Sequence, residues 1–186
     1  MNTKFLVYAA LMTAIIAVMG LIPAIPLPFM PVPIVLQNVG IFLAGILLGR
    51  KYGALSVIVF LLLVMVGAPL LSGGRGGFGV FLGPTAGYLV MYAVSAFLIG
   101  WVRDLQFEKL SFGRIFIIIL IFGVILLDTV GAIVMAFVIH MPISKALWLS
   151  LTFLPGDLIK AVIASLIAVA LYKNPVTSRI MKQMAA

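Results

Sequence analysis

Long apolar stretches alternate along the chain with short segments that collect its charges, prolines and glycines. No charged residue lies between Lys4 and Arg50, and five of the 10 prolines fall within residues 23–33. Because proline lacks the backbone N–H that a helix interior needs, this segment separates two helices. The pattern predicts six membrane-spanning helices, at residues 5–22, 34–49, 84–102, 115–139 and 155–172 and in the run from residue 51 to the glycine-rich segment 72–79.

The composition is typical of a membrane protein. Hydrophobic residues make up 65% of the 186 residues and charged residues only 9%, whereas about a quarter of the residues of a soluble domain are charged. We therefore predict an all-α membrane protein in which residues 1–186 form a single six-helix transmembrane domain. The first helix is expected to remain as a span, because its apolar run is longer than that of a removable signal sequence.

The basic residues indicate how the helices are oriented. The chain has 12 Lys and Arg against 4 Asp and Glu, but these cations lie between apolar runs, so the expected partner is a lipid bilayer and not nucleic acid. With the N-terminus inside the cell, nine of the 12 basic residues fall in cytoplasmic segments, namely Lys4, Arg50, Lys51, Arg103, Lys109, Arg114, Lys173, Arg179 and Lys182. The positive-inside rule then places both termini in the cytoplasm.

Two charged residues of the last predicted helix are the first candidates for ligand contact. Asp157 and Lys160 lie three residues apart in the sequence PGDLIK, near the outer end of the helix and on one of its faces. A carboxylate there accepts from ureido, amide or amine N–H groups, and an ammonium neutralises a ligand carboxylate. The pair therefore suits a small anionic molecule; the alternative is an internal ion pair that only stabilises the start of the helix.

The glycine-rich segment supplies a third charge, Arg75, within LSGGRGGFGVFLGPTAGYL. Glycines such as Gly73 let the backbone approach a ligand and expose N–H donors. The alternative is that Arg75 is a solvated residue of an outer loop. The segment contains G-x-G-x-x-G without a preceding short strand, and the chain has no G-x-x-x-x-G-K-[ST] sequence, so we do not expect it to hydrolyse ATP.

Four uncharged polar residues are expected at the same depth. Gln37 and Asn38 lie one turn inside the second predicted helix, and Thr85 and Tyr88 lie near the outer end of the fourth. Because the second, fourth and sixth helices all start from the outer side, these side chains are predicted to line one pocket with Asp157. Hydrogen bonding between helices is the alternative for each residue taken singly.

Asp128 lies in the middle of the fifth predicted helix. Either it carries a proton during transport, or it stays protonated and hydrogen-bonds to a neighbouring helix. The second role is favoured, because no other intramembrane carboxylate or histidine is expected at its depth. An intramembrane enzyme that uses Asp157 as general base would lack a nucleophile and a second carboxylate. With no Cys and 1 His, we expect no metal site.

Two features point to contacts beyond these residues. Ala10 and Ala14 form a small-residue face on the first predicted helix, suited to packing within the chain or to a partner membrane protein. The Pro-rich segment 23–33 is predicted to be an external lid, because its restricted backbone loses little entropy on closing over a ligand. Its apolar contacts would be Leu27, Phe29 and Met30. The alternative is a static connector.

Together, the Pro-rich segment, GGRGGFGVFLGPTAGYL, PGDLIK and the six-span layout resemble the BioY family, the biotin-specific substrate-capture components of energy-coupling-factor (ECF) vitamin transporters. The resemblance implies a subunit of a prokaryotic cell membrane that is not an enzyme, needs no cofactor and binds biotin from the extracellular side. It also implies a transmembrane coupling subunit and two cytoplasmic ATPases as partners, with an A-x-x-x-A face that Ala10 and Ala14 reproduce. The rival hypothesis is a proton-coupled carrier for a small anionic vitamin, in which Asp128 titrates.

Overall fold

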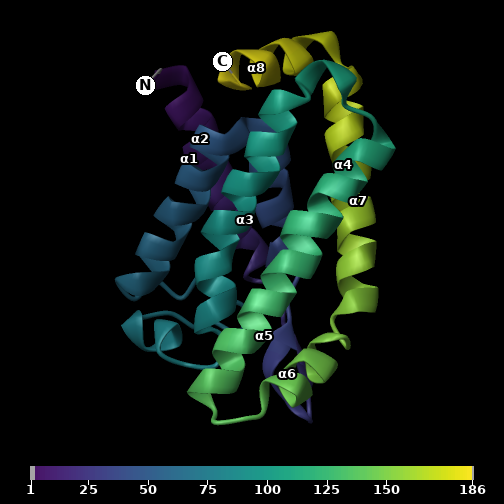
Figure 1. The fold of residues 1–186 in the computed structure, drawn as a ribbon. Helices are drawn as coiled ribbons and strands as arrows, with labels where there is room; N and C mark the ends of the chain where they lie inside the picture. Colours follow the sequence, from purple (N-terminus) through teal and green to yellow (C-terminus); the bar gives the residue numbers. More distant parts are fainter. Residues whose placement is uncertain (1–2, 186) are drawn as a thin grey trace.

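The computed structural model describes residues 3–185, most of which are helical. The longer helices run along one axis, and a short helix lies across each end of the bundle (Figure 1). In chain order the elements are α1 (Thr3–Met19), β1 (Ile25–Leu27), β2 (Met30–Ile34), α2 (Gln37–Met65), η1 (Phe78–Phe81), α3 (Ala86–Leu105), η2 (Phe107–Lys109), α4 (Phe112–Ile119), the π-helical η3 (Leu120–Ile125), α5 (Leu126–Val138), α6 (Ile143–Ser150), α7 (Leu154–Lys173) and α8 (Pro175–Ala185).

The chain reverses direction inside α2. Gly49 has φ +76° and ψ −176°, a conformation that residues with a Cβ rarely adopt. The two halves then pack together, since a Cβ on Gly53 would lie 2.4 Å from the carbonyl oxygen of Ala44. Gln37, at the start of α2, hydrogen-bonds the carbonyl of Leu70, beyond its end, at 3.0 Å. α2 is therefore two antiparallel helices joined at Gly49, which confirms the predicted break between residues 34–49 and the next apolar run.

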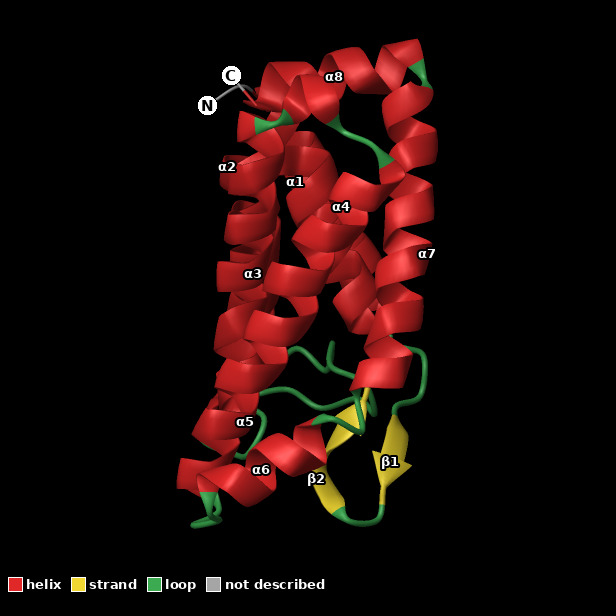
Figure 2. Cartoon of the chain, turned by 45° about the vertical axis from the view of Figure 1, so that its right-hand side comes forward, coloured by secondary structure: helices red, strands yellow, loops and turns green. Residues whose placement is uncertain are grey.

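The Pro-rich segment forms a small β-hairpin, so the fold is mostly helical and not all-α. β1 and β2 are antiparallel, with Ile25 opposite Ile34 and Leu27 opposite Met30. Alternating prolines and apolar residues favour extended backbone, and the outer edges of a two-stranded hairpin tolerate residues without an N–H. The hairpin lies with α6 at the end of the bundle opposite α8 (Figure 2).

The fifth predicted helix is irregular, and two short helices were not predicted. α4, η3 and α5 follow one another through residues 112–138. In η3, a Cβ on Gly123 would lie 2.6 Å from the ring of Phe42, so glycine allows α2 to approach closely here. α6 contains the segment around Trp148, and α8 follows the sixth predicted helix directly.

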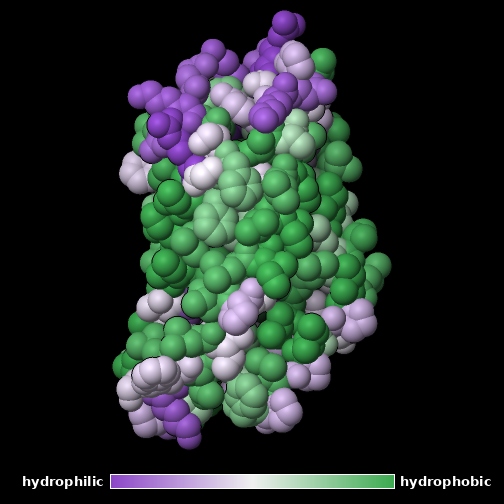
Figure 3. All heavy atoms as spheres, turned by 90° about the vertical axis from the view of Figure 1, so that its right-hand side faces the viewer, coloured by the Kyte–Doolittle hydropathy of each residue, from purple (hydrophilic) through white to green (hydrophobic). Residues whose placement is uncertain are grey.

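The surface is that of a multi-pass membrane protein. Among residues 3–185, four helical stretches are long and apolar enough to cross a bilayer, at residues 37–65, 86–105, 112–138 and 154–173, and α1 is a shorter apolar helix. The first of these counts both halves of α2, which reverses at Gly49. A broad hydrophobic band separates two hydrophilic ends (Figure 3). Large exposed apolar side chains lie on every one of these helices, which suits lipid and would favour aggregation in water. The first turn of α1 and the last turn of α8 lie at the same end of the bundle (Figure 1).

Candidate ligand-binding site

A pocket is lined by residues at the starts of α2, α3 and α7. These helix starts lie at the end of the bundle opposite α8 (Figure 1). Seven of the eight residues predicted from the sequence line the pocket, namely Gln37, Asn38, Arg75, Thr85, Tyr88, Asp157 and Lys160. Gly73 does not line the pocket, although its φ of +81° shapes the adjoining loop. The residues come from segments far apart in the sequence, so the pocket exists only in the folded chain.

The charged pair of α7 is a direct ion pair. The ammonium Nζ of Lys160 donates to Oδ1 of Asp157 at 2.7 Å, and the two side chains are only 8% and 3% exposed. Because the two groups touch, they cannot contact two ligand groups that lie far apart. They present instead a carboxylate acceptor beside an ammonium donor, an arrangement that suits one polar ligand group.

A hydrogen-bonded chain extends from this pair across the pocket. The amide Nδ2 of Asn38 donates to Oδ1 of Asp157 at 3.4 Å, and the hydroxyl of Tyr92 donates to Oδ1 of Asn38 at 2.8 Å. These hydrogen bonds thereby connect α2, α3 and α7. Tyr92, which the sequence analysis did not select, lies one helical turn after Tyr88, and that spacing was the available signal.

Asp128 also lines the pocket, although the sequence predicted for it a proton-carrying or interhelical role and not a place beside Asp157. Its carboxyl is buried on α5 and interacts with Asp157 and Lys160. The expectation that no second carboxylate shares its depth is wrong, because counting residues along each helix does not determine how helices are shifted against one another. An ionisable residue within a span was itself the signal.

Gln37 holds the wall of the pocket in place. Its Nε2 donates to the carbonyl of Ile16 at 3.2 Å and to that of Leu70 at 3.0 Å, and its Oε1 accepts from the backbone N–H of Ser72 at 3.3 Å. Both amide hydrogens are thus engaged by backbone. Gln37 therefore positions the glycine-rich segment against α1, and little of its hydrogen-bonding capacity remains for a ligand.

The glycine-rich segment brings a guanidinium to the mouth of the pocket. Leu71 and Arg75 form an antiparallel bridge around the positive-φ residues Gly73 and Gly74. Arg75 is exposed, donates to the carbonyl of Ser72 at 3.4 Å and forms no ion pair within residues 3–185. Its charge is therefore open to an anionic ligand, and Arg75 is both an exposed loop residue and a residue that lines the pocket.

Tyr88 and Thr85 line the wall formed by the start of α3. The Tyr88 ring packs edge-on against Phe153 with centroids 6.1 Å apart, and its buried hydroxyl has no hydrogen-bond partner among residues 3–185. A buried unpaired hydroxyl is unfavourable, so it is a candidate ligand contact. Thr85 Oγ1 already donates to the carbonyl of Val80 at 3.3 Å, which leaves its lone pairs available.

The pocket has little free space. Its free space is about 50 Å³, enough for only a few water molecules. An organic ligand can enter only if part of the wall moves. Val32 and Pro33 of β2 line the pocket, whereas the predicted lid contacts Leu27, Phe29 and Met30 do not.

The small-residue face of α1 points away from the bundle. Ala10 and Ala14 are exposed, whereas Ala9, Met12 and Ile16 on the opposite side are buried. Packing within the chain therefore does not explain Ala10 and Ala14. Within residues 3–185, no group of three or more His, Asp or Glu side chains lies close enough together to hold a metal ion.

Comparison with known proteins gives consistent matches over nearly the whole chain. The model of the BioY family matches residues 1–175. The biotin transporter BioY of Lactococcus lactis subsp. cremoris is 47% identical over 176 residues, 93% of each chain, and the probable biotin transporter BioY of Bacillus subtilis is 45% identical over 88% of each chain. A solved structure, the S-component for biotin from an ECF-type ABC transporter, matches with a TM-score of 0.89 and 45% identity over 92% of each chain. This chain therefore belongs to the BioY family.

Proposed function

We propose that this chain is the biotin-binding, substrate-capture subunit of an ECF-type importer. It acts as a transporter component and not as an enzyme, with biotin as the carried ligand and no cofactor. The observation that carries the proposal is the buried Asp157–Lys160 pair in a small pocket, in a chain whose relatives are named biotin transporters.

The pair matches the chemistry of a ureido group. A ureido edge presents an N–H donor beside a carbonyl acceptor, and the Asp157 carboxylate lies 2.7 Å from the Lys160 ammonium. We assign the N–H to Asp157 and the carbonyl to Lys160, with Asn38 and Tyr92 fixing the orientation of the carboxylate. The sequence-based assignment of Lys160 to the ligand carboxylate is less favourable, because the valerate chain keeps that carboxylate away from the ureido ring.

The carboxylate of biotin is assigned to Arg75. Arg75 lies at the mouth of the pocket without an ion-pair partner in residues 3–185, and a guanidinium binds a carboxylate through two hydrogen bonds. Apolar residues between the two polar sites, including Leu89 and Phe153, suit the ring and the valerate chain.

Calorimetric titration of the purified protein tests the proposal. In detergent and without ATP, we expect saturable binding of biotin with one site per chain, since the chain has no nucleotide-binding sequence of its own. Binding of labelled biotin should be displaced by unlabelled biotin. If the titration releases or absorbs no heat and labelled biotin shows no saturable binding, the proposal is refuted.

The proposed topology has six passes with both termini in the cytoplasm. α1, the two halves of α2, α3, the helix of residues 112–138 and α7 supply the passes, and the ends of the chain lie with most of the cations. The pocket then opens to the extracellular side. The chain has no Cys, so Lys145→Cys should react with an impermeant thiol reagent in whole cells while Lys51→Cys should not. The reverse result would invert the topology.

Transport is proposed to need a transmembrane coupling subunit and two cytoplasmic ATPases, with α1 as the docking face. Ala14→Phe should block biotin uptake in cells that contain these partners and leave biotin affinity unchanged, because Ala14 is exposed. Leu166→Phe, at an exposed position of α7, is the matched control and should transport normally. A parallel fall in affinity for Ala14→Phe would contradict a docking role.

A proton-coupled carrier is the second candidate function, and the place of Asp128 beside Asp157 favours it. In that case a protonophore would abolish uptake while depletion of ATP would not, and Asp128→Asn would stop transport. Under the leading proposal ATP depletion abolishes uptake. The two measurements on the same cells separate the candidates.

A further inference from the structure

A second cleft lies at the opposite end of the molecule, beside α8. It has a volume of about 760 Å³ and is lined by the segment from Asp104 to Lys109, by Arg114 and by Lys182 of α8. It shares no residue with the pocket described above. The two sites are therefore spatially distinct.

The cleft carries uncompensated positive charge. Asp104 is paired with the buried Arg103 at 2.6 Å, and Glu108 is paired with Lys182 at 2.6 Å. A hydrogen bond to Glu108 raises the pKa of Lys182, which keeps it charged at physiological pH. Lys109 and Arg114 are exposed and form no ion pair within residues 3–185. The guanidinium and the ammonium together suit a phosphate group.

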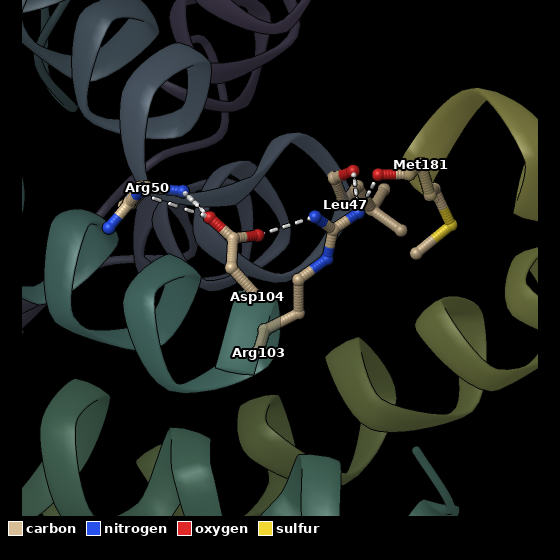
Figure 4. Close-up of polar contacts among 5 residues, drawn as sticks. All are labelled: Leu47, Arg50, Arg103, Asp104 and Met181. Atoms are coloured by element: carbon tan, nitrogen blue, oxygen red, sulfur yellow. Dashed lines mark hydrogen bonds and ion pairs between the residues drawn. The ribbon is translucent and has the colours of Figure 1, made fainter. Parts of the chain in front are cut away.

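The walls of the cleft are held in place by buried contacts. Arg103, which is fully buried, donates to Asp104 and also to the backbone carbonyls of Leu47 at 3.0 Å and Met181 at 2.8 Å (Figure 4). These bonds tie the end of α3 to α8 and to the turn of α2. The cleft is therefore already formed before any ligand arrives.

An apolar stripe leads from this cleft along α3 into the hydrophobic band. It consists of large exposed side chains spaced three or four residues apart, namely Val90, Val94, Phe97, Trp101 and Leu105. Leu105 is 69% exposed and also lines the cleft. Such spacing puts all five side chains on one face of the helix. Trp is common at the boundary between lipid tails and headgroups.

We propose that this cleft binds the headgroup of an anionic phospholipid, with Arg114 and Lys109 holding the phosphate and an acyl chain lying along the stripe on α3. Basic clefts at membrane boundaries are known to hold such headgroups. The continuity of charge and apolar stripe favours an amphiphile over free phosphate, which would use the cations alone.

Native mass spectrometry of the detergent-solubilised full chain tests this site. Phosphatidylglycerol should be retained in preference to zwitterionic phosphatidylethanolamine. Each removed cation should weaken binding by about fivefold, so the double variant Lys109→Gln, Arg114→Gln should bind phosphatidylglycerol roughly 25-fold more weakly. Lys51→Gln, an exposed cation at the same end but outside the cleft, is the matched control and should bind normally.

Further measurements distinguish a bound phospholipid from a free phosphate compound and check that the variants fold. Glycerol phosphate in millimolar excess should not displace the lipid, and Leu105→Asn should weaken lipid binding because it interrupts the stripe. Equal retention of the two lipids, unchanged binding by the double variant, or full displacement by glycerol phosphate would each overturn the proposal. Size-exclusion profiles and melting temperatures of the variants should match the parent, since the substituted side chains are exposed.

Discussion

Replacing Lys160 by Met distinguishes a ligand-binding role from a structural one. The substitution keeps the apolar stem of the side chain and removes its ammonium. Asp157 then keeps the long 3.4 Å hydrogen bond from Asn38 and the neighbouring Asp128 carboxyl, in a site where its side chain is 3% exposed. The carboxylate is left buried without a counter-charge from its own helix.

The magnitude follows from this burial. Breaking a buried ion pair by removing one partner costs about 3–5 kcal/mol, and we expect the lower end because the pocket adjoins the surface. The melting temperature should fall by roughly 6 °C or more for a chain of this size. Loss of one charge-assisted hydrogen bond to the ligand corresponds to about 1.5–3 kcal/mol, or roughly a tenfold to hundredfold weaker affinity for biotin.

The double variant Lys160→Met, Asp157→Asn separates the two effects. Removing both charges should restore most of the melting temperature, because no unpaired charge stays buried, but it should not restore affinity. Affinity is measured by calorimetry for biotin and for its carboxamide, which lacks the free carboxylate. We expect Lys160→Met to weaken both ligands equally, and Arg75→Gln to weaken biotin alone.

The opposite pattern would refute this reasoning. If Lys160→Met weakens only biotin and Arg75→Gln weakens neither ligand, Lys160 holds the carboxylate, as the sequence analysis assumed. If the double variant recovers full affinity, the pair stabilises the fold and does not contact the ligand.

Three further predictions concern other parts of the molecule. A Cβ on Gly131 would lie 2.4 Å from the Tyr88 ring, so Gly131→Ala should displace that ring and lower biotin affinity several-fold, as measured by titration. The overpacking should also cost about 1–3 kcal/mol of stability. Gly113→Ala is the control, because nothing lies within 4 Å of its added Cβ; equal affinities of the two variants would contradict a role for Tyr88. Arg103→Met leaves Asp104 without its 2.6 Å partner and should lower the unfolding free energy by about 3–5 kcal/mol. The melting temperature should fall while biotin affinity stays unchanged. An unchanged melting temperature would mean that the contacts in Figure 4 add nothing to stability. A spin label at Leu27→Cys in this cysteine-free chain should lose mobility when biotin is added, because Val32 and Pro33 of the hairpin line a pocket too small for an organic ligand unless its wall moves. An unchanged spectrum at saturation would make the hairpin a static connector.

Much of this protein is determined by local sequence. Charge-free apolar runs, prolines and the basic residues between the runs indicate a membrane protein and the places where its helices break, because a bilayer acts on each segment separately. The reversal at Gly49 falls beside Arg50 and Lys51, where the pattern predicts it. Residues spaced along one helix, such as Asp157 and Lys160, were assigned to one face for the same local reason.

The relations between helices were decided only by tertiary packing. Asp128 lies close to Asp157 because of the way its helix is shifted along its axis against α7. That shift cannot be predicted by counting residues along either helix. Gln37 is engaged by backbone of α1 and of the segment after α2, although its depth alone is the same as that of Asn38. Arg103 was counted from the sequence as a cytoplasmic cation, yet folding buries it completely among carbonyls of two other elements. Burial and partners depend on which faces meet, and that is a property of the whole bundle.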